Sequence, residues 1–75
     1  MSIQVKPTGI LKSYSGGESP VSIESTGDNI REILLKMHIP SEMVAMVTVN
    51  GTLQEKDFIP QDQDVVQLIP LIGGG

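Results

Sequence analysis

The sequence lacks several residue types on which common functional sites depend. Its 75 residues include no cysteine and one histidine, His38. A chain without cysteine has neither a disulfide framework nor a thiol nucleophile, and a lone histidine cannot hold a metal without partner ligands. We therefore expect no metal site, no bound cofactor, a reducing cytoplasmic setting and a fold held together by packing.

Basic residues are also scarce. Nine acidic residues stand against five basic ones, the net charge is −4, and lysine and arginine form no cluster. Phosphate-binding surfaces need such clusters, so we expect no nucleic-acid partner. The longest apolar runs are far shorter than the roughly 20 residues of a membrane span, and no charged leader followed by an apolar segment opens the chain. We expect no membrane association.

The N-terminal third of the sequence predicts two strands in a single small domain. Apolar and polar residues alternate over residues 2–6, which is typical of a half-buried strand. Residues 10–18 have the serine and glycine content of a turn region, and we expect Tyr14 to fold over the sheet edge. Alternation resumes at Val21 and Ile23, so a second short strand should pair back on the first.

One amphipathic helix of about two and a half turns is predicted next. Its apolar residues recur at the helical spacing and are Ile30, Ile33, Leu34 and Met37. Asp28 or Asn29 should be the N-cap, and with Asn29 in that place Glu32 completes a capping box. His38 lies in the region of the C-terminal cap, and Pro40 prevents the helix from continuing.

The C-terminal half predicts three strands. Residues 44–49 are apolar on both faces, which predicts an interior strand covered on two sides. Asn50-Gly51 predicts a type I′ hairpin turn with a short return strand over 52–54. Phe58 should anchor the following polar loop on the core, and residues 65–69 should form the last strand. The element order predicts an α+β fold with one main helix packed on one face of a mixed four- to five-stranded sheet.

The chain ends in Gly73-Gly74-Gly75, after an apolar strand and Pro70. A phosphate-binding glycine loop leads into a helix N-terminus, and no helix follows here. Glycine loses more conformational freedom on ordering than any other residue, so a terminal triplet does not serve the fold. We expect a globular body over residues 1–70 and a flexible tail over 71–75, with a Gly75 carboxylate that becomes reactive by acyl-adenylation. The alternative is a frayed end without function.

Leu71 and Ile72 are apolar yet lie beyond the last strand. We expect them to insert into grooves of partner proteins, with Gly73 and Gly74 threading a narrow channel. An exposed apolar patch on the sheet beside the tail should be the docking face.

Three segments together resemble the ThiS/MoaD family of ubiquitin-like sulfur carriers, small β-grasp proteins that end in diglycine. Val47-Thr48-Val49-Asn50-Gly51 looks like the family's strand and hairpin, and residues 61–70 look like its Asp-Gly-Asp turn, final strand and proline. Gly74-Gly75 falls on the diglycine. The sequence departs from the family pattern at Gln63, where the family usually has glycine, and at Gly73, where a small residue such as alanine is frequent. The turn must therefore be strained at Gln63 or adopt a type without positive φ there.

The resemblance implies a carrier that is not itself an enzyme. A ubiquitin-activating-type adenylating enzyme would use ATP to adenylate Gly75, and sulfur from a cysteine desulfurase or rhodanese would convert it to a thiocarboxylate. A sulfur-accepting synthase, either thiazole synthase or the molybdopterin synthase large subunit, would take the sulfur for thiamine thiazole or molybdopterin. Two alternatives remain open: a ubiquitin-like modifier conjugated through Gly75 to protein lysines, and a non-covalent β-grasp interaction module.

Overall fold

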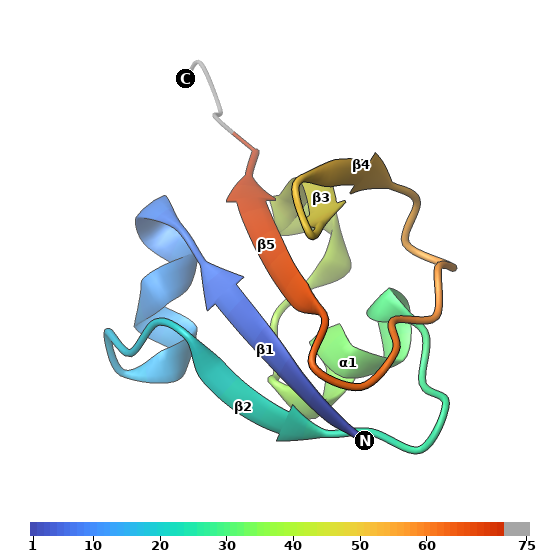
Figure 1. The fold of residues 1–75 in the computed structure, drawn as a ribbon. Helices are drawn as coiled ribbons and strands as arrows, with labels where there is room; N and C mark the ends of the chain where they lie inside the picture. Colours follow the sequence, from blue (N-terminus) through green and yellow to red (C-terminus); the bar gives the residue numbers. More distant parts are fainter. Residues whose placement is uncertain (72–75) are drawn as a thin grey trace.

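The structure, a computed structural model, describes residues 1–71. These residues form five strands, one α-helix and two 3₁₀ helices (Figure 1). In chain order the elements are β1 (Ser2–Pro7), η1 (Gly9–Ser15), β2 (Val21–Glu24), α1 (Ile30–Lys36), η2 (Ser41–Met43), β3 (Val44–Val49), β4 (Thr52–Gln54) and β5 (Val65–Pro70).

The strands form one mixed sheet in the order β2-β1-β5-β3-β4. β5 pairs in parallel with β1 and antiparallel with β3, and the two remaining pairs, β1 with β2 and β3 with β4, are antiparallel. The last strand of the chain therefore lies at the centre of the sheet and is hydrogen-bonded along both edges. This placement fixes the point at which the chain passes from the sheet into Leu71, beside the ends of β1 and β3 (Figure 1).

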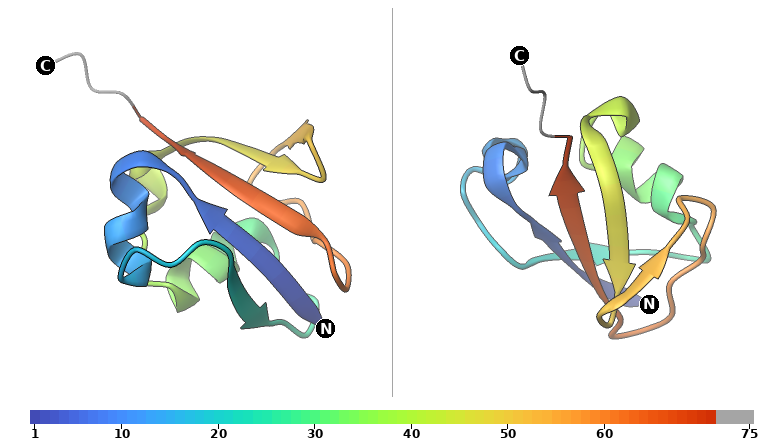
Figure 2. Two further views of the ribbon diagram at one scale, coloured as in Figure 1. Left: turned by 60° about the vertical axis from the view of Figure 1, so that its left-hand side comes forward. Right: turned by 90° about the horizontal axis from the view of Figure 1, so that it is seen from above.

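The hydrophobic core lies between α1 and one face of the sheet (Figure 2). Alternate strand residues point to this face because successive side chains in a strand point in opposite directions. The core residues are Ile3, Val5, Leu11, Ile30, Ile33, Leu34, Met37, Ile39, Val44, Val47, Val49, Val66 and Leu68. Phe58 packs against this cluster from the polar loop, as predicted. The predicted α+β architecture is confirmed.

Side-chain and main-chain caps close both ends of α1. The Asn29 side chain accepts from the Glu32 N–H at 2.9 Å, and Glu32 Oε1 accepts from the Asn29 N–H at 3.0 Å, so the capping box is confirmed. At the other end the His38 N–H donates to Leu35 O and the Ile39 N–H to Leu34 O, which is a Schellman motif. His38 takes the left-handed position, with φ of 58°. The helix ends at Lys36 with Met37 as the C-cap, slightly short of the predicted length.

The two turns flanking the C-terminal strands both contain residues at positive φ. Asn50 and Gly51 have φ of 52° and 85°, as the predicted type I′ turn requires. Gln63 has φ of 68°, so the turn before β5 takes the strained form rather than one that avoids positive φ. The last strand begins at Val65 as predicted and extends one residue further, to Pro70.

Two sequence-based expectations differ from the structure. Residues 9–15 form the 3₁₀ helix η1 rather than an irregular turn region. Leu11 is buried in the core, and a helical backbone over these residues allows its side chain to reach that position. The prediction that the strand over 44–49 is covered on both faces is wrong. β3 is interior to the sheet, but Ala45 and Met46 are exposed and only the face toward α1 is covered.

Candidate functional site

The chain leaves the sheet at the C-terminal end of β5. Pro70 is still paired with Val44 of β3, and the Leu71 N–H donates to Met43 O at 2.8 Å. The Leu71 side chain is 57% exposed. The main chain is therefore attached to the body as far as the Leu71 amide, while the side chain of the same residue faces solvent.

The remaining predicted site residues are Ile72, Gly73, Gly74 and Gly75, and they lie outside the described residues. The proposed division of the chain into a body over 1–70 and a tail over 71–75 therefore stays a prediction.

Two 3₁₀ helices flank the point at which the chain leaves β5 (Figure 2). On one side, Gly9 at the start of η1 lies so close to β5 that a Cβ there would be 3.0 Å from Pro70 Cγ. Thr8 Oγ1 donates to Leu68 O at 2.7 Å and ties the same segment to the strand. On the other side, η2 supplies the Met43 carbonyl that accepts from Leu71.

A contact between the two 3₁₀ helices completes the surroundings of the exit point. The Tyr14 O–H of η1 donates to the sulfur of Met43 at 3.5 Å, so this contact joins the two 3₁₀ helices; the expected position of Tyr14 over the sheet edge stays a prediction. Ile10 of η1 is 59% exposed and Tyr14 is 38% exposed. We call Ile10, Tyr14, Met43 and Leu71 the exit surface. The sequence indicated only Leu71 in this role.

The sheet face opposite α1 carries exposed apolar side chains near the same end. Met46 pairs with Ile69, and Leu53 pairs with Thr48, so all three apolar residues share this face. Met46 is 47% and Leu53 63% exposed, and Ile69 is half-buried. We call Met46, Leu53 and Ile69 the outer patch. The apolar patch predicted beside the tail is thus present, and its docking role stays a prediction.

The apolar residues on both faces of the strand over 44–49 indicate the outer patch and not a second covered face. An apolar residue on each face of the strand over 44–49 predicted cover on both faces. In the structure, the second apolar face is open to solvent at Met46.

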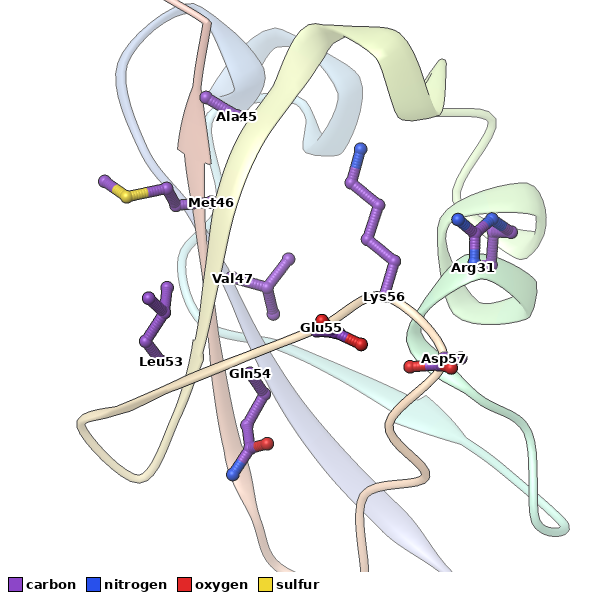
Figure 3. A pocket seen from close by; sticks show the side chains of 9 residues that line it. All are labelled: Arg31, Ala45, Met46, Val47, Leu53, Gln54, Glu55, Lys56 and Asp57. Carbon is purple, nitrogen blue, oxygen red and sulfur yellow. The ribbon is translucent and has the colours of Figure 1, made fainter.

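A groove of about 550 Å³ lies beside the outer patch, between the β3–β4 pair and α1 (Figure 3). Its charged residues are two basic and two acidic ones: Arg31, Lys56, Glu55 and Asp57. Lys56 runs toward η2, where its Nζ donates to Ser41 O at 2.7 Å. Since the charges cancel and one lysine is engaged with the main chain, the groove has no electrostatic preference for an anion.

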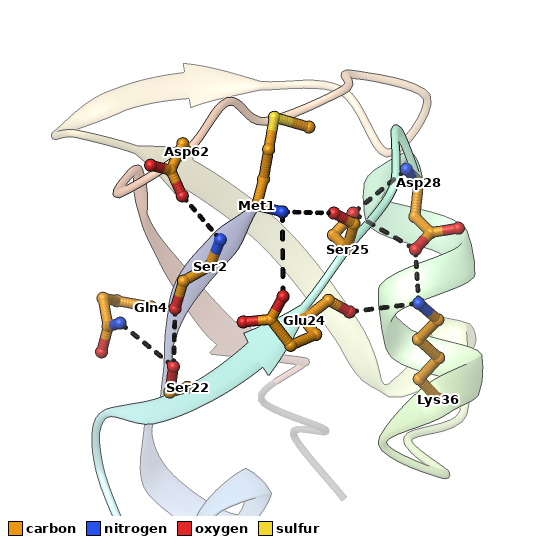
Figure 4. Close-up of polar contacts among 9 residues, drawn as sticks. All are labelled: Met1, Ser2, Gln4, Ser22, Glu24, Ser25, Asp28, Lys36 and Asp62. Carbon is orange, nitrogen blue, oxygen red and sulfur yellow. Dashed lines mark hydrogen bonds and ion pairs between the residues drawn. The ribbon is translucent and has the colours of Figure 1, made fainter.

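Polar side chains join β2 to α1 away from the exit surface (Figure 4). The Asp28 carboxylate accepts from Lys36 Nζ and from Ser25 Oγ, and Lys36 also donates to Glu24 O at 3.2 Å. The Lys36 hydrogen bond, followed in smaller measure by that of Ser25, lowers the pKa of Asp28 below its ordinary value. This arrangement holds the helix against the sheet edge and offers no open site for a substrate.

Residues 1–71 contain no group of three or more histidine, cysteine, aspartate or glutamate side chains placed to hold a metal. None of their helices has the length and apolar character needed to cross a membrane. Outside the exit surface, the outer patch and the groove, the exposed large apolar residues of the described part of the chain are Met1, Leu35 and Ile59.

Comparisons with solved structures identify the fold. The chain is similar to SAMP1 from Haloferax volcanii, with a TM-score of 0.75 and 20% identity, and to a ThiS thiamine biosynthesis protein from Geobacter metallireducens, with a TM-score of 0.63 and 25% identity. It is also similar to a chain of the protein-protein complex of subunits 1 and 2 of molybdopterin-converting factor from Helicobacter pylori 26695, with a TM-score of 0.64 and 21% identity. In each case the match covers 100% of both chains.

The five-stranded mixed sheet with its helix is therefore a ubiquitin-like β-grasp fold. A search of curated proteins finds no match to the sequence. The family model described as the ThiS family matches residues 8–75, which include the exit surface and the terminal glycines. The chain belongs to the ThiS family.

Proposed function

We propose that this protein is a sulfur carrier that bears sulfur as a thiocarboxylate on Gly75. The observation that carries the proposal is the exit geometry: a central strand, hydrogen-bonded along both edges, ends at Pro70, and the Leu71 N–H beyond it donates to Met43 O. In the sequence, Ile72 and three glycines follow. A rigid body thus holds a short segment whose final three residues have no side chain to block entry into a narrow channel.

The chemistry required of the carrier is small. An oxygen of the Gly75 carboxylate attacks the α-phosphorus of ATP on a partner enzyme, and pyrophosphate leaves. Hydrosulfide then attacks the acyl carbon of the adenylate, and AMP leaves; a persulfide donor would instead give an acyl disulfide, whose S–S bond a thiol then reduces to release the thiocarboxylate. The product is a thiocarboxylate. In these steps the body supplies no acid, base or nucleophile of its own.

The proposed partners follow from these two steps. A ubiquitin-activating-type adenylating enzyme supplies the ATP chemistry, and a cysteine desulfurase or rhodanese supplies the sulfur. The structural likeness to a chain of the Helicobacter pylori molybdopterin-converting factor complex supports a synthase as the sulfur acceptor. Membership of the ThiS family supports thiazole synthase as the other choice. Leu71 and Ile72 would enter grooves of these enzymes, and the outer patch would dock beside them.

The test is a reconstitution with the cognate adenylating enzyme, ATP and sulfide, followed by the intact mass of the carrier. We expect the mass to rise by the difference between a sulfur and an oxygen atom. A variant that lacks Gly75 is the matched control: it should fold as the full chain does, because the described core extends from Ile3 to Leu68, and it should not gain sulfur. An unchanged mass of the full chain with an enzyme of verified activity would contradict the proposal.

The fate of the Gly75 acyl group in cell extract distinguishes a sulfur carrier from a ubiquitin-like modifier. A modifier would pass the Gly75 acyl group to a lysine amine, so that cell extract would contain larger conjugates that disappear with the Gly75 deletion. Sulfur transfer without such conjugates would identify a carrier alone.

A further inference from the structure

The tail is short compared with the body from which it extends. Four residues, 72–75, follow Leu71. At roughly 3.3–3.6 Å per residue, four residues reach at most about 14 Å from the body, whatever conformation they take. An enzyme that encloses the Gly75 carboxylate in a water-excluding site must therefore bring its own surface against the residues around the exit point.

The side chains within that reach include apolar ones that the fold does not bury. Ile10 follows Gly9, which packs against Pro70, and Pro70 precedes Leu71. Ile10 and Leu71 thus each adjoin, along the chain, a residue of the Gly9–Pro70 contact, and they are 59% and 57% exposed. Exposed apolar side chains gathered at one place on a small soluble protein commonly mark an interaction site.

The exit surface is also held firmly in place. Leu11 anchors η1 in the core, Thr8 ties its start to β5, and Tyr14 contacts Met43 of η2. A surface that is ordered before binding loses little conformational freedom on docking, which favours its use in recognition.

We propose that η1 is a docking element for the adenylating enzyme, with Ile10 inserted into an apolar depression beside the mouth of the channel that receives the tail. This inference rests on the proposed function and adds to it a contact outside the tail and on a different surface from the outer patch. The partner surface is apolar where it meets Ile10 and Leu71, because both of these side chains are apolar and exposed.

The test measures ATP–pyrophosphate exchange by the adenylating enzyme as a function of carrier concentration. Ile10→Asp should raise the KM for the carrier by about tenfold or more with kcat little changed, because a buried carboxylate in an apolar contact weakens binding without altering the reacting atoms. Ile10→Ser should have a smaller effect in the same direction. Amide NMR spectra should show that both variants keep the fold, since Ile10 is exposed.

The matched control is Leu35→Asp. Leu35 is 73% exposed on α1, which lies away from the end of β5 at which the chain leaves (Figures 1 and 2). The KM of the adenylating enzyme for Leu35→Asp should equal its KM for the unchanged chain.

The possible results are distinguishable. If the unchanged carrier supports exchange and Ile10→Asp has the same KM, the docking inference is wrong and the adenylation step of the proposed function stands. Equal increases in KM for Ile10→Asp and Leu35→Asp would also overturn the inference, because they would show a general charge effect. If the unchanged carrier supports no exchange, the proposed function fails and the docking inference fails with it.

Discussion

The side chains of Asn50 and Asp64 join the two turns that bracket the C-terminal half of the sheet. Asn50 Nδ2 donates to Asp64 Oδ1 at 2.8 Å, and Asn50 Oδ1 accepts from the Val65 N–H at 2.9 Å. The Asn50 N–H donates to Val65 O at 2.8 Å. The hairpin turn between β3 and β4 is thus bonded directly to the first residue of β5. This fixes the start of the strand whose other end releases the tail.

Asn50→Ala should lower the free energy of unfolding by about 1–3 kcal/mol. The change removes two side-chain hydrogen bonds and places alanine at φ of 52°, a conformation that asparagine tolerates better. Urea denaturation measures the effect. Asn50→Gly is the control, because glycine accepts the positive φ and loses only the side-chain bonds. If both variants were as stable as the unchanged chain, the joined turns would contribute nothing to stability.

Gln63→Gly should stabilise the protein. Gln63 is exposed at φ of 68°, where a residue with a Cβ is strained by about 1–2 kcal/mol. The greater freedom of glycine in the unfolded chain offsets about 0.4–1 kcal/mol of that gain, which leaves a net increase of about 0.5–1 kcal/mol. The same substitution at Gln61, which is not among the residues at positive φ, should instead destabilise. Thermal denaturation of the pair compares them, and a lower Tm for Gln63→Gly would contradict the account of the turn.

Acid should weaken the contact between Asp28 and Lys36. The pKa of Asp28 in the folded protein is lowered, chiefly by the Lys36 hydrogen bond, relative to a value near 3.9 in the unfolded chain. The stabilisation is therefore present above about pH 4 and is lost as the pH falls through the folded pKa. Asp28→Asn should have a lower free energy of unfolding than the unchanged chain at neutral pH, and this difference should become smaller in acid. A difference in the free energy of unfolding that stays constant from pH 7 to pH 2 would count against this ionic contribution.

Met46→Asp should weaken binding to the sulfur-accepting synthase and leave the fold intact. Met46 is 47% exposed on the outer patch, so a charge there costs little in the free protein and is poorly tolerated in an apolar interface. Isothermal titration calorimetry with the synthase should show a Kd raised by about tenfold or more. Ser22→Asp is the matched control, because Ser22 is exposed on the same face of the sheet but lies on β2, away from the patch. Unchanged affinity for Met46→Asp would remove the outer patch from the docking surface.

Local sequence rules predicted the elements whose ends are fixed by near neighbours. The capping box at Asn29 and Glu32, the positive φ at Asn50 and Gly51, and the last strand all depend on residues a few positions apart. Such features are determined mainly by backbone conformation and local hydrogen bonds, so the sequence alone specifies them.

Features that depend on distant parts of the chain were not predictable in the same way. Residues 9–15 have the composition of a turn region, and their helical form follows from the burial of Leu11 and the packing of Gly9 on Pro70. The exposure of Met46 follows from the absence of a second layer over β3, which no local pattern reveals. The exit surface is formed by residues from η1, η2 and the end of β5, so its members come together only in the folded chain.

The central claim is that the folded body carries sulfur on the terminal atom of Gly75 and nowhere else. Top-down fragmentation of the carrier, after reaction with its adenylating enzyme, ATP and sulfide, tests this most directly. We expect every fragment that contains Gly75 to carry sulfur in place of oxygen, and every fragment that ends before Gly75 to have its unmodified mass. Sulfur found on a fragment without Gly75, or on none, would contradict the claim.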